Sequence, residues 1–198
     1  MNDRELLGFH AISPKKSLGQ NFLHDPNALQ KIVEIADLPP DAEVLEIGPG
    51  TGNLTRVLSE HARRVVAVET DDRLMPILRA TFAATPAVEL IHADILSLDV
   101  STLFDRRPFY VVANLPYYIT SAILRQLLEN EPRPQRLVIT VQREVADRLV
   151  AAPGDLSLLG VSVQFYGQPQ IAMRLNPAAF WPRPDVESAV VRIDVYPR

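Results

Sequence analysis

The chain has 198 residues, of which 47% are hydrophobic and 22% are charged, a composition typical of a globular protein with one domain. It contains no cysteine, which excludes disulfides, thiol nucleophiles and thiolate metal sites. The formal net charge of −4 gives no support to nucleic-acid binding, and no apolar run is long enough for a signal peptide or a membrane span, so we expect a cytoplasmic protein that does not bind membranes.

The predicted elements alternate between helices and strands. A first helix begins at Asp25-Pro26, an N-cap residue followed by proline at the first helical position, and ends before Pro39-Pro40. Strands are then predicted at residues 44–47, 64–69, 88–92, 108–113, 136–141, 160–166 and 188–195, with helices near 53–61, 72–82, 119–129 and 142–151. This alternation predicts an α/β fold with a mostly parallel seven-stranded sheet and helices on both faces. Because no long helix separates the last two strands, they are expected to form an antiparallel edge hairpin.

A glycine-rich turn, Gly48-Pro49-Gly50-Thr51-Gly52, lies between the first strand and the helix that follows it. Its G-x-G-x-G pattern differs from the G-x-G-x-x-G of dinucleotide binders and from the phosphate loop of ATP-binding proteins. Glu69 ends the next strand about 20 residues later, the spacing of a carboxylate that binds ribose hydroxyls. With Glu46 also acidic and no lysine nearby, the pattern favours a cationic nucleoside such as S-adenosylmethionine over a phosphorylated one.

The third strand is followed by Asp94 and Ile95. Asp94 could accept a hydrogen bond from an adenine amine while Ile95 packs on the ring. Each carboxylate alone could equally be a solvated residue at a strand end, but the four features in this order favour a nucleoside site.

The sequence Asn114-Leu115-Pro116-Tyr117 follows the apolar run at residues 109–113. The side-chain oxygen of Asn114 and the backbone carbonyl of Pro116 can both accept hydrogen bonds from one exocyclic amine, and the ring of Tyr117 can stack on the base that carries it. The alternative is an asparagine-proline turn that only ends a strand. The hypothesis is a site that holds the amino group of a nucleobase.

Taken together, these motifs resemble the ribosomal RNA adenine N6,N6-dimethyltransferases, specifically the small-subunit (16S) enzymes. The resemblance runs from about Lys15 to Val195 and includes three further motifs: Gly19-Gln20-Asn21-Phe22-Leu23, Gln142-Arg143-Glu144-Val145-Ala146 and Phe180-Trp181-Pro182-Arg183-Pro184-Asp185-Val186-Glu187-Ser188. It implies a class I, Rossmann-like methyltransferase fold. The implied cofactor is S-adenosylmethionine, with S-adenosylhomocysteine as product and no metal.

The resemblance also assigns residues. It implies cofactor contacts from Gln20, Asn21, Leu23, Glu46, Gly48, Gly50, Gly52, Glu69, Asp94, Ile95 and Asn114. It further implies that Asn114, Pro116 and Tyr117 hold the target adenine and that Phe180 covers its other face. The implied reaction is dimethylation of two adjacent adenosines near the 3′ end of 16S rRNA in the immature 30S subunit, by a monomer.

For the domain organisation, we expect residues 1–24 to form an N-terminal arm with a cofactor-lid motif and residues 25–198 to form the catalytic domain. Full-length members of this family continue into a small helical domain, so the chain, which stops at Arg198, is expected to hold the catalytic domain alone.

Two other functions remain open from the sequence. A 23S rRNA methylase of the macrolide-resistance kind shares most of these motifs, and a nucleic-acid-binding relative without activity, like the mitochondrial transcription factors, shares the fold. The Gly-Gln-Asn-Phe-Leu and Asn-Leu-Pro-Tyr forms favour the 16S enzyme. The intact glycine turn, Glu69, Asp94 and Asn114 argue against loss of activity.

Overall fold

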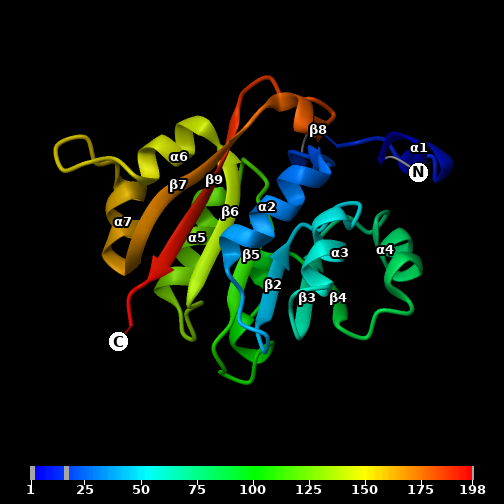
Figure 1. Ribbon diagram of the computed structural model, residues 1–198, viewed down its shortest axis with the longest axis horizontal. Coiled ribbons are helices and arrows are strands. Elements are labelled where there is room, and N and C mark those ends of the chain that lie inside the picture. Colours follow the sequence, from blue (N-terminus) through cyan, green and yellow to red (C-terminus); the bar gives the residue numbers. More distant parts are fainter. Residues whose placement is uncertain (1–2, 16–17, 198) are drawn as a thin grey trace.

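The computed structural model describes residues 3–15 and 18–197, so residues 1, 2, 16 and 17 of the predicted N-terminal arm lie outside the described part. Its main sheet has seven strands in the order β4-β3-β2-β5-β6-β9-β7 (Figure 1). The strands are β2 (Glu43–Ile47), β3 (Arg64–Glu69), β4 (Val88–His92), β5 (Tyr110–Asn114), β6 (Arg136–Gln142), β7 (Gly167–Leu175) and β9 (Ser188–Val195). Strands β4, β3, β2, β5 and β6 are parallel, whereas β9 runs antiparallel to both β6 and β7. The predicted fold class is confirmed.

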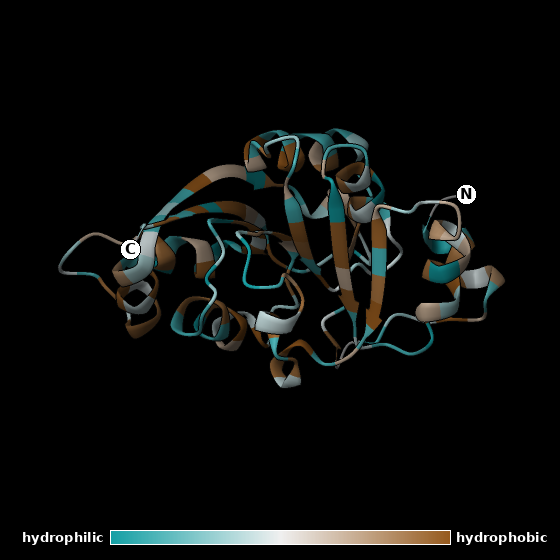
Figure 2. Cartoon of the chain, turned by 90° about the horizontal axis from the view of Figure 1, so that it is seen from below, coloured by the Kyte–Doolittle hydropathy of each residue, from teal (hydrophilic) through white to brown (hydrophobic). Residues whose placement is uncertain are grey.

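Helices cover both faces of the sheet. Helices α2 (Pro26–Ala36), α3 (Asn53–Ser59) and α4 (Met75–Phe82) lie on one face, and α5 (Thr120–Glu129), α6 (Arg143–Leu149) and α7 (Leu158–Tyr166) lie on the other (Figure 1). Side chains alternate along each strand, so Val44 and Val65 pack toward α2 while Leu45 and Val66 pack toward α5. Figure 2 shows hydrophobic residues, coloured brown, along the strands of the sheet.

Local sequence explains the helix limits that were predicted. The Asp25 carboxylate accepts a hydrogen bond from the Ala28 amide at 2.8 Å and caps α2, and Pro26 occupies its first turn. The buried face of α2 consists of Ala28, Leu29, Ile32, Val33 and Ala36, at helical spacing.

No helix within residues 3–15 and 18–197 is long and apolar enough to cross a membrane.

The predicted strand at residues 160–166 is wrong, because this segment forms helix α7. Ser157 caps it by accepting a hydrogen bond from the Gly160 amide at 3.1 Å, and Leu159 and Val163 form its buried face. The strand of the edge hairpin is β7, at residues 167–175. Alternation of apolar and polar residues in Val161-Ser162-Val163-Gln164 imitates a strand, whereas Pro169 obscures the true one, which tolerates proline because it lies at the sheet edge.

Besides β7 and the short 3₁₀ helices, three elements within the described residues were not predicted. Helix α1 (Asp3–Phe9) packs its Leu7 beside Leu74 and Leu78, next to α4. The other two are short strands, β1 (Phe22–Leu23) and β8 (Phe180–Trp181), which form a separate antiparallel pair. The rings of Phe22 and Trp181 stack with centroids 6.4 Å apart. This pair attaches the segment before α2 to the segment before β9.

Candidate active site

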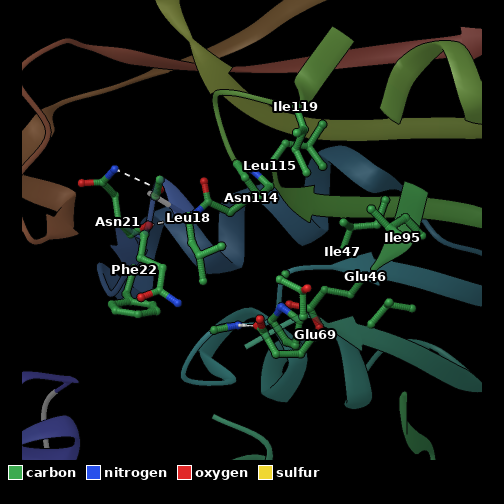
Figure 3. A pocket seen from close by; sticks show the side chains of 18 of the residues that line it. Leu18, Asn21, Phe22, Glu46, Ile47, Glu69, Ile95, Asn114, Leu115 and Ile119 are labelled. Carbon is green, nitrogen blue, oxygen red and sulfur yellow. Dashed lines mark hydrogen bonds between the residues drawn. The ribbon is translucent and has the colours of Figure 1, made fainter. Parts of the chain in front are cut away.

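A cavity lies at the carboxyl ends of β2, β3 and β5, where the chain order of the strands reverses. This is the usual ligand position in open α/β sheets. Of the residues predicted for the site, Gln20, Asn21, Leu23, Glu46, Gly48, Gly50, Glu69, Asp94, Ile95, Asn114, Pro116 and Tyr117 line the cavity. Figure 3 shows Glu69 and Asn114 on opposite sides of the cavity, with Phe22 at one end and Ile95 at the other.

The glycine turn after β2 brings its backbone to the cavity wall. Gly48 and Gly50 have φ values of 68° and 60°, a conformation that favours glycine. A Cβ at Gly48 would find its nearest neighbour, the Pro116 ring, only at 3.9 Å, so the missing side chain leaves room beside the cavity. Gly52 does not line the cavity. A Cβ there would lie 2.7 Å from the ring of Phe82, so this glycine allows close packing on α4.

Two buried carboxylates form the acidic side of the cavity. The side chain of Glu69, at the end of β3, accepts hydrogen bonds from the Gly50 amide at 3.1 Å and from the Asp71 amide at 2.8 Å. Glu46, at the end of β2, is 1% exposed, and its Oε2 atom has no hydrogen-bond partner. Within the described part of the chain, no lysine, arginine or histidine lines the cavity.

Burial shifts the ionisation of both groups. It raises the pKa of Glu46 to about 8, an effect that the nearby Thr55 hydroxyl opposes and the charge of Glu69 reinforces. Burial also raises the pKa of Glu69, against the two backbone amides that bind its carboxylate. Such a pair of carboxylates is stabilised by a ligand that carries positive charge or donates hydrogen bonds.

Asp94 and Ile95 lie at the β4 end of the cavity. One oxygen of Asp94 accepts a hydrogen bond from the Leu96 amide at 2.9 Å and caps the 3₁₀ helix at Ile95–Ser97. Asp94 is exposed, and Ile95 is buried with 4% of its surface accessible. A carboxylate oxygen and an apolar side chain are thus available at one place.

Asn114 ends β5 and faces the cavity from the opposite side. Its Nδ2 atom donates a hydrogen bond to the backbone carbonyl of Asn21 at 3.0 Å, which fixes the orientation of the amide. Its Oδ1 atom is buried without a partner. Buried polar atoms are normally paired, so this oxygen is available to a hydrogen-bond donor that enters the cavity.

The Pro116 carbonyl is already occupied. It accepts hydrogen bonds from the Thr120 hydroxyl at 3.0 Å and from the Ile119 amide at 3.3 Å, at the start of α5. An amine could bind this oxygen once the Thr120 hydroxyl rotates away.

The two aromatic residues predicted to hold a base have different surroundings. Tyr117 is partly buried and lines the cavity, and its hydroxyl group forms a hydrogen bond of 2.8 Å with the hydroxyl of Ser188. Burial raises the pKa of Tyr117, partly offset by this bond. Phe180 is only 3% exposed, packs in the core cluster with Leu23 and Leu175, and does not line the cavity. The structure therefore brings Tyr117, but not Phe180, together with Asn114.

We call residues 18–24 the strap, and residues 18–23 of it form one wall of the cavity. Asn21 donates from its side chain to the Gly19 carbonyl at 3.2 Å, and Leu23 is 5% exposed and pairs with Phe180 in the small sheet. Gln20 donates to the carboxylate of Asp71 at 2.8 Å. Asp71 was not predicted to belong to the site, because its only signal in the sequence is its position two residues after Glu69.

The cavity fits a nucleoside with a cationic group better than a metal. It has a glycine-rich turn, three acidic side chains (Glu46, Glu69 and Asp94) and two unpartnered buried oxygens, on Glu46 and Asn114. Among the residues that the structure describes, no cluster of three or more metal-ligating side chains occurs.

Comparison with known proteins assigns the family. The model of the ribosomal RNA adenine dimethylase family matches residues 12–197, which include every residue of the cavity. The chain belongs to this family. The predicted resemblance is confirmed.

Curated members of the ribosomal RNA adenine dimethylase family are similar over nearly the whole chain. Ribosomal RNA small subunit methyltransferase A of Alkaliphilus metalliredigens is 47% identical over 188 residues, which cover 92% of this chain and 66% of that protein. The protein of the same name from Dehalococcoides mccartyi is 44% identical over 193 residues, which cover 97% of this chain and 66% of that protein. The chain thus spans about two thirds of the length of these relatives.

Solved structures of the same kind are also similar. The 23S rRNA methyltransferase ErmE superposes with a TM-score of 0.80 at 35% identity, covering 89% of this chain and 70% of ErmE. A dimethyladenosine transferase from Plasmodium falciparum gives a TM-score of 0.78 at 28% identity, and the match covers 88% of this chain and 63% of that protein.

Proposed function

We propose that this chain catalyses methyl transfer from S-adenosylmethionine to N6 of two adjacent adenosines near the 3′ end of 16S rRNA, giving N6,N6-dimethyladenosine. The observation that carries the proposal is the unpartnered Oδ1 of Asn114, which faces an acid-lined cavity in a chain of the rRNA adenine dimethylase family. The higher identity to small-subunit methyltransferases than to ErmE supports 16S over 23S rRNA as the substrate.

The cofactor would be held between β2, β3 and β4. Glu69 would bind the ribose hydroxyls, because its carboxylate is fixed by the amides of Gly50 and Asp71. Asp94 would accept from the adenine amine of the cofactor, and Ile95 would pack on its ring. Gln20, Asn21 and Leu23 would close the cavity from the strap side. The cationic group would favour the ionised form of Glu46, whose carboxyl keeps its proton up to about pH 8 in the free protein.

When bound, S-adenosylmethionine supplies a methyl group that is electrophilic without further activation. The adenine N6 amine is a weak nucleophile, because its lone pair is delocalised into the ring. Asn114 Oδ1 would accept a hydrogen bond from this amine and direct its lone pair toward the methyl group. Pro116 would contribute a second acceptor after its Thr120 bond is exchanged. Orientation of this kind can supply several kcal/mol without a strong base.

The proton balance requires no catalytic base. Methyl transfer leaves N6 positively charged and acidic, so its proton passes to water. This agrees with a described cavity lining that contains no histidine or lysine. The second methyl transfer repeats these steps after the monomethylated nitrogen rotates.

The target adenine must leave its base stack to reach Asn114, and Tyr117 would then stack on its face. Phe180 would cover the other face only if its ring left the core. We further propose that the substrate is the immature 30S particle and that the protein acts as a monomer in the cytoplasm. For the domain organisation, we propose that residues 1–24 form an arm with the cofactor lid and that residues 25–198 form the catalytic domain.

The test uses labelled S-adenosylmethionine with three separate substrates: immature 30S particles, 23S rRNA and duplex DNA. The modified base is identified after digestion. We expect N6,N6-dimethyladenosine from the 30S particles. Label only in 23S rRNA would support the macrolide-resistance activity instead, and binding of RNA without transfer would support a non-catalytic relative.

A further inference from the structure

Asp71 is a buried acidic residue that the proposed chemistry does not use. It lies two residues after β3 and is 2% exposed. Its carboxylate accepts hydrogen bonds from Arg73, at 2.8 Å from Nε and 2.6 Å from Nη2, and from Gln20 Nε2 at 2.8 Å. Lys15 Nζ lies 3.8 Å away. The bond from Arg73 is the main reason that the pKa of Asp71 falls to about 2, so the group stays ionised near neutral pH.

The bond to Gln20 attaches the strap to the end of β3. The side-chain oxygen of Gln20 accepts from the Lys15 amide at 2.7 Å, so its nitrogen is oriented toward Asp71. An ionised acceptor makes this a charge-assisted hydrogen bond, and the site is largely withdrawn from solvent. Gln20 itself lines the cavity, so the bond fixes a part of the cavity wall.

The backbone amide of Asp71 also contacts a residue that lines the same cavity. Its amide donates to Glu69 Oε1 at 2.8 Å, while the other oxygen of Glu69 accepts from Gly50. One residue therefore contacts both the carboxylate on the floor of the cavity and the strap that forms its wall.

We propose that Asp71 is a positioning residue that holds the strap against the cofactor cavity and thereby sets the affinity for the cofactor. The identity of the cofactor, S-adenosylmethionine, rests on the proposed function. A strap that leaves its position in part of the molecules weakens the apparent affinity by the fraction that remains in place. Turnover at saturating cofactor is spared, because excess cofactor restores the bound arrangement.

The test compares Asp71→Asn with Asp72→Asn. Both variants remove one negative charge at adjacent positions, but Asp72 is exposed and lies outside the cavity lining. Loss of a charge-assisted hydrogen bond predicts that Asp71→Asn raises KM for S-adenosylmethionine by about tenfold or more. We expect kcat to stay within about twofold, since saturating cofactor restores the strap and with it the bond that orients Asn114. Asp72→Asn is expected to match the wild type.

A second measurement needs no cofactor. The chain contains one tryptophan, Trp181, whose ring stacks on Phe22 of the strap. In the free protein, Asp71→Asn is expected to change the emission of Trp181 and to speed hydrogen exchange in the peptide covering residues 18–24. The melting temperature of the core should change little, which separates a local hold on the strap from a general structural role.

A KM for Asp71→Asn within twofold of wild type, or strap exchange and Trp181 emission equal to those of Asp72→Asn, would overturn the proposal. If Asp71→Asn does not fold, Arg73→Gln replaces it, because Arg73 donates both to Asp71 and to the Ser13 carbonyl at 3.1 Å. The same two changes are then expected, at smaller size, and their absence counts against Asp71. Failure of the proposed function would appear differently, as a wild type that binds no S-adenosylmethionine but keeps the strap behaviour.

Discussion

Asn114 donates its amide hydrogen to the backbone carbonyl of Asn21, 3.0 Å away in the strap, and this bond leaves Oδ1 buried and unpartnered at the cavity. Two segments far apart in the sequence therefore determine which atom of the amide faces the ligand. The strap contributes to the orientation of Asn114 as well as to the cavity wall.

Replacing Asn114 tests the catalytic role of this oxygen. We expect Asn114→Ala to lower kcat by about a hundredfold or more, because misplacing the reacting amine has effects of that size. The affinity for S-adenosylmethionine, measured by calorimetry, should fall only modestly, since Glu69 and Asp94 remain. Asn130→Ala, at an exposed position after α5, serves as the control. Near-normal turnover of Asn114→Ala would show that the oxygen has no role in catalysis.

The hydrogen bond between Tyr117 and Ser188 can be tested with a double-mutant cycle. Tyr117→Phe leaves the Ser188 hydroxyl unpaired at a site that is 1% exposed, and Ser188→Ala leaves the tyrosine hydroxyl unpaired. The double variant removes both groups. We expect its loss in free energy of unfolding to be smaller than the sum of the single losses by about 1 kcal/mol. Strict additivity in denaturant melts would mean that the two hydroxyls do not stabilise each other.

The buried carboxyl of Glu46 predicts a pH dependence of stability. Its pKa is raised from 4.5 to about 8 in the folded protein, so between these values the folded state keeps a proton that the unfolded state has lost. The free energy of unfolding therefore falls as pH rises through this window. Glu46→Gln lacks this titration, so its stability relative to wild type should increase from pH 4.5 to about 8 and then level off. A difference that does not vary with pH would contradict the raised pKa.

Alanine substitutions at Gly50, in the glycine turn, and at Gly8, in helix α1, are expected to change the free energy of unfolding in opposite directions. Gly50 has a φ of 60°, and a Cβ there would lie 2.7 Å from the Phe22 ring. We expect Gly50→Ala to lower the free energy of unfolding by about 1–3 kcal/mol, through strain and overpacking. At Gly8, in helix α1, no atom beyond the adjacent residues and the helix's own backbone lies within 4 Å of the added Cβ. Gly8→Ala should stabilise by about 0.5–1 kcal/mol, the usual gain for alanine in a helix. Equal effects in thermal melts would count against the close contact with Phe22.

Much of the fold could be predicted because parallel strands have simple rules. Once the strands before Gly48, Glu69, Asp94 and Asn114 are assigned, their carboxyl ends must meet at one edge of the sheet. The structure places these residues around one cavity. The exchange of strand and helix at residues 158–175 shows where the rules fail, because a short amphipathic helix and an edge strand have similar apolar patterns.

The contacts of Asp71 and Ser188 could not be predicted from the sequence, for a different reason. In Thr70-Asp71-Asp72-Arg73, both aspartates look like solvated residues of a loop, and only the packing of the strap makes the first one buried. The hydroxyl of Ser188, at the start of β9, likewise has a partner from a distant segment, Tyr117 in the loop after β5. Pairings between distant segments decide these environments, and no local pattern encodes them.

The small sheet formed by β1 and β8 has a consequence for biosynthesis. Leu23 pairs with Phe180 and Phe22 with Trp181, so the strap obtains its strand pairing only from residues that leave the ribosome late, whereas its bonds to Asp71 and Asn114 involve residues made earlier. During translation, β2, β3 and the glycine turn can form while the strap still lacks its partner strand. The strap wall of the cavity is therefore completed in two stages, and a nascent chain that stops before β8 would leave Phe22 without its contact to Trp181.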